Sequence, residues 1–101
     1  MIYEVSFRPE ADADLSALYD YIAEHSSLVR AGDFMMRIEA ACMALAEFPR
    51  RGVPRDDLGP GLRTLAFERR AVIVYGIERQ TVRILHIFYA ARDFERALAG
   101  A

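Results

Sequence analysis

The side chains of this 101-residue chain that could do chemistry are few, and one histidine is the best acid–base candidate among them. His86 stands in a strand-like run, three residues from both Arg83 and Tyr89. A histidine beside a cation is the kind of group that can act as a general acid or base. A histidine within an apolar strand is more often a hydrogen-bonded packing residue, and we favour that interpretation.

The other reactive side chains favour structural roles. His25 falls at an expected helix end, where a cation suits the negative end of the helix dipole. Cys42 lies beside an apolar helix stripe and is interpreted as a small buried hydrophobe. Asp56 and Asp57 are adjacent loop acids, which are usually solvated or bonded to turn amides. One cysteine and two histidines exclude an intramolecular disulfide and make a structural zinc site improbable, so we expect no metal and no cofactor.

Arginine supplies the remaining chemistry, because all 13 basic residues are arginines and the chain has no lysine. Residues 1–49 carry three arginines against nine acids, a net of −6, and residues 50–101 carry ten against six, a net of +4. Such asymmetry can mark a basic working face, since arginine binds carboxylates and phosphates through two hydrogen bonds. The total of −2 and the lack of a base-reading helix argue against direct DNA binding.

Hydrophobic periodicity predicts a strand and two helices in the first half. Residues 2–7 alternate as in a strand, and Pro9 suits the first turn of a helix that stops near His25. Ser26 or Ser27 can cap a second helix, which Pro49 ends. Asp33 and Arg37, four residues apart, are expected to pair on its solvent side. The short connection predicts an antiparallel helical hairpin.

The second half predicts a loop and then strands. Residues 48–61 hold three of the four prolines and three of the six glycines, so we expect irregular structure there. Residues 62–67, 71–77 and 81–89 are expected strands, joined by short turns into an antiparallel meander. Strict alternation in the last strand places Val82, Ile84, His86 and Phe88 on one face. Residues 93–99 are expected to form one or two helical turns.

These elements predict a single domain over residues 1–101 of the α+β class. The helical hairpin must bury its apolar stripe on one face of the sheet, which gives two layers. We therefore expect an antiparallel helical hairpin packed on a four-stranded sheet, in the order β-α-α-β-β-β. No apolar stretch approaches the roughly 20 residues that span a bilayer, and the start does not read as a signal peptide. We expect a reduced, cytoplasmic protein.

Ordered motifs along nearly the whole chain carry a resemblance. They are Pro9-Glu10-Ala11, the run from Leu45 to Pro49, Pro60-Gly61-Leu62-Arg63, Val72 to Tyr75, Val82 to Ile87 and Ala91-Arg92-Asp93. With these motifs the chain resembles the ParE-type toxins of the RelE/ParE superfamily, the toxin halves of type II toxin–antitoxin pairs. One departure is Arg8, where the family often has a serine that would cap the first helix, so we expect a frayed helix start.

The resemblance implies a function. It implies a toxin that inhibits DNA gyrase by protein–protein binding, without catalysis. A ParD-type antitoxin would neutralise it in a hetero-oligomer and would supply the only contact with DNA; no membrane partner is expected. The partner-binding candidates combine part of the helix stripe with the sheet. They are Leu15, Leu18, Tyr19, Ile22, Phe34, Ile38, Arg63, Arg70, Arg83, Tyr89 and Arg92.

The alternative is a RelE-like ribosome-dependent mRNA endonuclease. RelE-like sequences carry an arginine shortly before the tyrosine of the central strand, whereas this chain has Val72 before Tyr75. The lysine-rich loop of those enzymes is missing, and residues 93–98 contain no tyrosine or histidine. These departures favour the gyrase-directed toxin over the ribonuclease.

Overall fold

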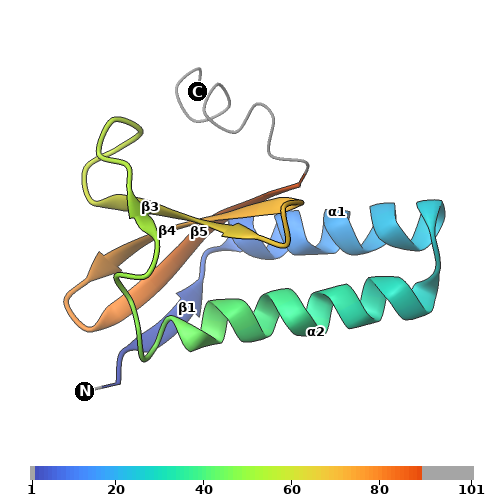
Figure 1. Ribbon diagram of the computed structural model, residues 1–101, viewed down its shortest axis with the longest axis horizontal. Helices are drawn as coiled ribbons and strands as arrows, with labels where there is room; N and C mark the ends of the chain where they lie inside the picture. Colours follow the sequence, from blue (N-terminus) through green and yellow to red (C-terminus); the bar gives the residue numbers. More distant parts are fainter. Residues whose placement is uncertain (1, 90–101) are drawn as a thin grey trace.

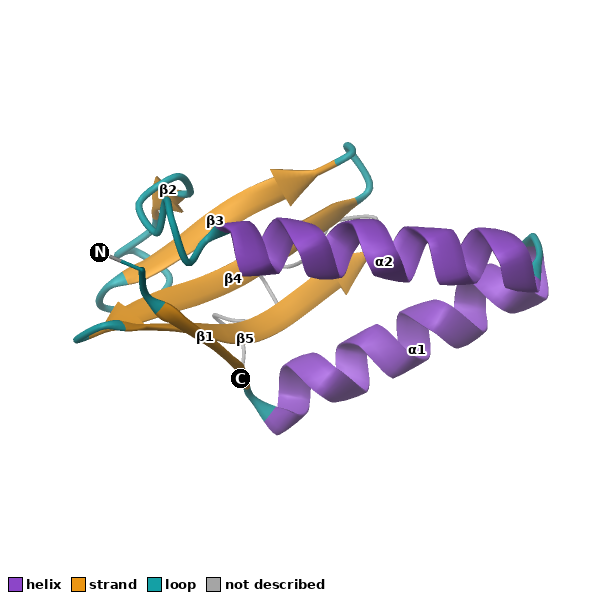
Figure 2. Cartoon of the chain, turned by 90° about the horizontal axis from the view of Figure 1, so that it is seen from below, coloured by secondary structure: helices purple, strands orange, loops and turns teal. Residues whose placement is uncertain are grey.

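A computed structural model describes residues 2–89 of the chain. A hairpin of two helices covers one face of a twisted sheet, so the domain has the two layers expected of an α+β fold (Figures 1 and 2). In chain order the elements are β1 (Glu4–Phe7), α1 (Pro9–His25), α2 (Leu28–Ala44), β2 (Val53–Pro54), β3 (Leu62–Phe67), β4 (Ala71–Glu78) and β5 (Thr81–Tyr89).

The sheet corrects the prediction of four strands. It has five strands in the order β1-β5-β4-β3-β2, and it is mixed, because β1 runs parallel to β5. The parallel pairing follows from the path of the chain. The helical hairpin returns the chain to the end of the sheet where β1 begins, so β3 runs in the direction of β1. The two turns that follow reverse the direction twice, and β5 therefore runs parallel to β1. The extra strand is β2, two residues within the expected loop, and its Pro54 is tolerated at the sheet edge.

The helix ends show which local signals held. Ser27 caps α2 as predicted, with its Oγ accepting a hydrogen bond from the Arg30 N–H at 3.1 Å. Arg8 gives α1 no side-chain cap, yet the helix begins at Pro9, because the Arg8 carbonyl accepts from the N–H groups of Ala11 and Asp12. The regular part of α2 ends at Ala44, before Pro49, and hydrogen-bonded turns fill the interval.

A bulge in β5 overturns the predicted strict alternation. Val74 pairs with His86 and Tyr75 with Ile84, so Leu85 is the extra residue. The bulge reverses the facing of all later residues. Ile87 therefore faces the helices with Ile84, and His86 faces away.

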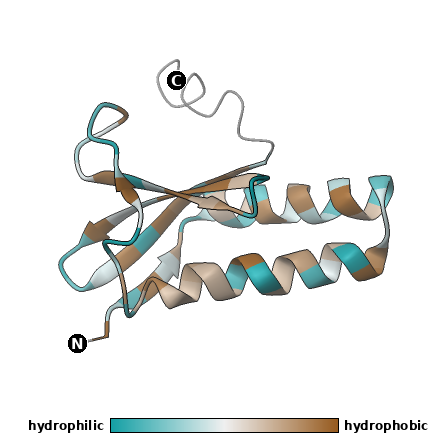
Figure 3. Cartoon of the chain, in the orientation of Figure 1, coloured by the Kyte–Doolittle hydropathy of each residue, from teal (hydrophilic) through white to brown (hydrophobic). Residues whose placement is uncertain are grey.

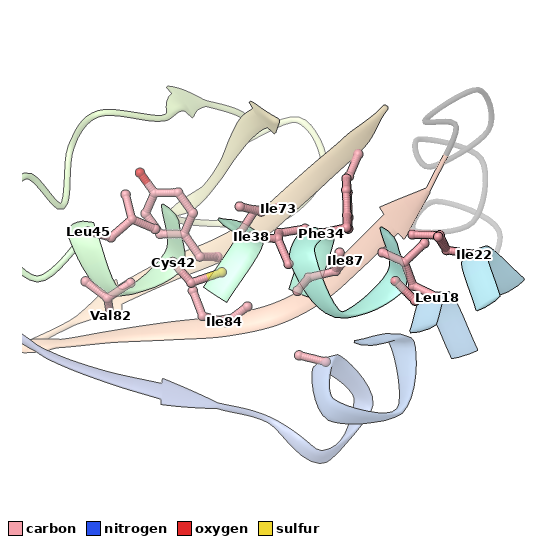
Figure 4. Packing of buried hydrophobic residues seen from close by; sticks show 14 residues of the cluster. Leu18, Ile22, Phe34, Ile38, Cys42, Leu45, Ile73, Val82, Ile84 and Ile87 are labelled. Carbon is pink, nitrogen blue, oxygen red and sulfur yellow. The ribbon is translucent and has the colours of Figure 1, made fainter. Parts of the chain in front are cut away.

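The main core lies between the hairpin and the sheet. Figure 4 shows α2 residues packed against strand residues, with Phe34, Ile38 and Cys42 facing Ile73 and Ile84. Ile38, Cys42, Ile73 and Ile84 are fully buried, and burying each such side chain contributes about 1.5–3 kcal/mol. Strand β4 is the middle strand of the sheet and is buried from Ala71 to Tyr75.

One long-range ion pair also joins the layers. Arg37 of α2 donates from Nε and Nη2 to the two carboxylate oxygens of Glu68, at 2.8 and 3.1 Å. The sequence predicted that Arg37 pairs with Asp33, and this prediction is wrong. Arg37 pairs instead with Glu68 of the β3–β4 turn, because both carboxylate oxygens of Glu68 accept hydrogen bonds from the guanidinium.

Candidate partner-binding groove

The tip of the helical hairpin extends beyond the end of the sheet (Figure 2). A groove lies at this tip. We call this surface the tip groove, and its volume is about 650 Å³. Both helices contribute to it, together with the β3–β4 turn and the last residue of β5. Its lining residues are Tyr21, Ile22, His25, Ser26, Arg30, Asp33, Phe34, Arg37, Arg70 and Tyr89.

Aromatic rings form the floor of the tip groove. Tyr21 stacks on His25 with ring centroids 4.1 Å apart, and Tyr89 lies 5.5 Å from Tyr21. Phe34 meets Tyr89 edge-on at 6.1 Å. His25 is held at the end of α1 by a hydrogen bond between Nδ1 and the Tyr21 carbonyl at 2.9 Å, in the helix-end position predicted for it. Such linked rings offer a preformed apolar surface to a partner side chain.

The rim of the tip groove is mostly cationic. Arg30, Arg37 and Arg70 contribute three positive charges against the one negative charge of Asp33. The hydrogen bond from Arg37 lowers the pKa of the Glu68 carboxyl and raises the pKa of the guanidinium, so Arg37 is committed to the fold. Arg70 is exposed in the β3–β4 turn, which makes it a cation that an acidic partner can reach.

A second, smaller groove of about 430 Å³ adjoins the first along α1 and β5. It lies where β5 runs on past β1, since the pairing of these strands ends at Phe7 and Ile84. Asp14 closes part of this edge, with its Oδ2 accepting from the Ile87 N–H at 2.9 Å and lying 3.2 Å from Nδ1 of His86. His86 also stacks on Phe88, so it is the hydrogen-bonded packing residue that we favoured.

The predicted partner-binding residues divide between the grooves and the core. Ile22, Phe34, Arg70 and Tyr89 line the tip groove, and Leu18 and Tyr89 line the smaller one. Three others lie against or within the main core, where Ile38 is fully buried and the partly buried Leu15 and Tyr19 pack beside it.

The remaining arginines of that set lie elsewhere. Arg63 Nη1 donates to the carbonyl oxygens of Arg50 at 3.1 Å and Gly52 at 2.7 Å, so it secures the segment after α2. Nη2 of Arg83 lies 3.3 Å from Oε1 of Glu78, near the end of the sheet opposite the tip groove. Arg92 and the expected helical turns of residues 93–99 lie outside the described residues.

Sequence reasoning missed Tyr21, Arg30 and Arg37 as groove residues. Tyr21 and Arg30 sit on either side of the hairpin turn, and only the three-dimensional hairpin brings them beside Tyr89. The one available signal was their place at the facing ends of two helices joined by a short connection. Asp14 was also missed, because an acid near the start of a helix is ordinarily interpreted as a partner of the helix dipole and not as a group that bonds to a strand.

The loop acids behave as the sequence indicated. Asp56 Oδ1 accepts from the Gly61 N–H at 2.8 Å, and Arg55 donates to both carboxylate oxygens of Asp57. That bonding lowers the pKa of the Asp57 carboxyl. Within residues 2–89 no three histidine, cysteine, aspartate or glutamate side chains gather as metal ligands. Over the same range no helix is both long and apolar enough to span a membrane.

Comparison with known proteins places the chain in a family. Residues 5–94 match the family described as ParE toxin of type II toxin-antitoxin system, parDE. The chain belongs to the ParE toxin family. Toxin ParE3 of Caulobacter vibrioides is 35% identical over 74 residues, which are 73% of each chain. Toxin ParE1 of the same organism is 30% identical over 91 residues, which cover 89% of this chain and 93% of that toxin.

Solved structures agree with the ParE assignment. The chain is similar to a chain of the chromosomal ParDE system of P. aeruginosa, with a TM-score of 0.77 and 25% identity, covering 87% of this chain and 96% of that one. The toxin–antitoxin complex RelBE2 of Mycobacterium tuberculosis has a chain of related fold, with a TM-score of 0.55 and 22% identity. That match covers 88% of this chain and 99% of the other.

Proposed function

We propose that this ParE toxin acts by binding DNA gyrase, without catalysis of its own, and is neutralised by a ParD-type antitoxin. The observation that carries the proposal is the use of the sheet arginine Arg63. Nη1 of its guanidinium donates to two backbone carbonyls, which holds the side chain against the segment after α2 rather than directing it toward a substrate phosphate. A metal-free ribonuclease needs such cations at the reacting phosphate.

The central tyrosine supports the same proposal. The Tyr75 side chain is fully buried, and its hydroxyl donates to the Pro49 carbonyl at 2.7 Å and accepts from the Gly52 N–H at 2.8 Å. Burial raises the pKa of this hydroxyl, which keeps it protonated at neutral pH. A hydroxyl committed in this way is unsuited to act as a general base.

The tip groove is the surface that we assign to the antitoxin. Its aromatic floor and cationic rim suit an acidic, amphipathic helical segment, in which apolar side chains pack on Tyr21 and Tyr89 and carboxylates meet Arg70. The solved ParDE and RelBE complexes pair toxins of related fold with antitoxins. We infer that this chain pairs with its own antitoxin through the tip groove.

A supercoiling assay tests the target. Purified toxin at micromolar concentration is expected to block gyrase supercoiling or to trap cleaved DNA, and a stoichiometric amount of antitoxin is expected to reverse the effect. Absence of both effects would exclude gyrase as the target. Reversal by the antitoxin shows that the toxin in the assay was folded and able to bind its antitoxin.

One observation keeps a ribonuclease as the second candidate. Arg83 and His86 pair with Gly76 and Val74 of β4, so both lie on the sheet face turned away from the helices. In a ribonuclease Arg83 would be the cation and His86 the base, on one surface of the sheet. Toxin-dependent mRNA cuts in translating ribosomes, lost in both Arg83→Ala and His86→Ala, would establish this alternative in place of gyrase inhibition.

A further inference from the structure

The outer face of α2 carries apolar side chains that no part of residues 2–89 covers. Val29 is 73% exposed, Met36 is 71% exposed and Met43 is 52% exposed. Their spacing of seven residues, close to two helical turns, places them in one row along the helix. In Figure 1 this helix lies at the lower side of the molecule, with no other element beneath it.

Small residues flank and extend this row. Ala40 and Ala44 are exposed, and Gly32 is partly exposed within the first half of α2. A Cβ added at Gly32 would meet nothing within 4 Å, so no contact within the described chain requires glycine there. A mid-helix glycine costs helix stability, and close approach of another helix is an established use for one. We call these residues with Leu28 the α2 stripe: Leu28, Val29, Gly32, Met36, Ala40, Met43 and Ala44.

The α2 stripe is symmetric about Met36. Reversing the helix about that residue exchanges Val29 with Met43 and Gly32 with Ala40. A surface whose apolar positions map onto one another in this way complements a second copy of itself when the two helices run antiparallel. We propose that two copies of this chain associate through an isologous, antiparallel contact of α2 with α2, with the two-fold axis at Met36.

The size of the contact sets its strength. The contact is one helix of 17 residues. A stable complex buries roughly 800 Å² per partner, so this single-helix contact predicts a weak, concentration-dependent dimer. The stripe residues do not line the tip groove, so the dimer stands independently of the proposed function.

Cysteine cross-linking tests the axis and the direction of pairing. Mild oxidation of Met36→Cys is expected to give a covalent dimer, because residue 36 meets its own symmetry mate. Val29→Cys alone is expected to remain monomeric, whereas a mixture of Val29→Cys and Met43→Cys cross-links. The native Cys42 does not interfere, since it is fully buried and burial raises the pKa of its thiol to about 12. Efficient self-cross-linking of Val29→Cys would mean parallel pairing and would overturn the proposal.

Sedimentation over a concentration series provides the second test, with the toxin free and bound to antitoxin. Met36→Glu is expected to abolish the concentration-dependent dimer of the free toxin, and Val53→Glu is the matched control, because Val53 is 62% exposed and lies on β2 rather than on α2. Far-ultraviolet circular dichroism confirms that both variants fold. A wild-type chain that stays monomeric up to several hundred micromolar, or equal behaviour of the two variants, would overturn the proposal.

Discussion

The two ends of the helix–sheet sandwich are built in opposite ways. At the end where α2 meets the sheet, residues 45–53 are tied to β3 and β4 by buried or partly buried hydrogen bonds from Tyr75 and Arg63. At the other end, the tip of the hairpin stands away from the sheet and leaves the tip groove (Figure 2). We call the first the closed end and the second the open end.

The difference separates stability from recognition. At the closed end the polar groups of Tyr75 and Arg63 bond to backbone groups of the same chain. At the open end Arg70 and the rings of Tyr21 and Tyr89 are presented to a groove. Figure 3 shows hydrophilic residues in the strand turns and in bands along both helices. Changes at the closed end should therefore affect folding, and changes at the open end should affect binding.

The largest expected effect comes from a glycine at the closed end. A Cβ at Gly52 would lie 2.6 Å from the Tyr75 hydroxyl and 2.9 Å from the Thr64 carbonyl oxygen. Gly52→Ala must displace the tyrosine and break its hydrogen bonds, so we expect a loss of about 3 kcal/mol or more in the free energy of unfolding. Chemical denaturation measures this loss.

Gly32→Ala is the matched control for that substitution. A Cβ there meets nothing within 4 Å, and alanine favours a helix, so a gain of about 0.5–1 kcal/mol is expected. Equal destabilisation by the two substitutions would contradict the assignment of the closed end as the stabilising one.

The next effect comes from removing a single oxygen atom at the closed end. Tyr75→Phe keeps the ring but leaves the buried Gly52 N–H and Pro49 carbonyl without their partner. The expected loss is about 2 kcal/mol, because unsatisfied buried groups carry a desolvation cost. Thermal or urea unfolding at pH 7 measures it, and a loss below 0.5 kcal/mol would show that water replaces the hydroxyl.

The same hydroxyl predicts a pH dependence. Burial raises the pKa of Tyr75 above its ordinary value of 10.0, so its neutral form stabilises the folded chain. A group whose pKa is higher in the folded state contributes stability below its unfolded pKa and loses it as pH rises through the folded pKa. The stability difference between wild type and Tyr75→Phe should therefore shrink above pH 10. A constant difference from pH 7 to 11 would be inconsistent with this titration.

At the open end a charge reversal should affect binding alone. Arg70→Glu places a negative charge on the rim of the tip groove, and we expect about a tenfold loss of antitoxin affinity with less than about 0.5 kcal/mol change in stability. Arg79→Glu is the control, because Arg79 is also an exposed turn arginine but lies at the opposite end of the sheet. Calorimetric titration with antitoxin measures the affinity of both variants. An equal loss of affinity in Arg70→Glu and Arg79→Glu would show only a general effect of net charge.

The contrast between the ends also explains what the sequence could predict. Caps and periodicity are local, so Ser27, Pro9 and the apolar rows of both helices predicted the hairpin correctly. The Leu85 bulge and the parallel place of β1 depend on pairing between distant segments, and nothing local marks them.

The candidate site follows the same rule. Phe34, Arg70 and Tyr89 were predicted from apolar pattern and charge, and the structure brings them to one groove. Arg63 was predicted from the same kind of signal but lies at the closed end, because charge along a chain does not reveal which carbonyl oxygens a folded loop turns toward an arginine.

The smallest expected effect is a gain in stability in the turn that supports Arg70. The β3–β4 turn places two non-glycine residues in the left-handed region, with φ of 50° at Glu68 and 58° at Arg69. A turn whose two central residues both have positive φ favours glycine at the second of them, since a side chain is strained there. Arg69→Gly should therefore raise the free energy of unfolding by about 0.5–1 kcal/mol, whereas Glu68 must stay because it binds Arg37. Urea unfolding measures the gain, and unchanged antitoxin affinity would show that the turn serves the open end through Arg70 rather than Arg69.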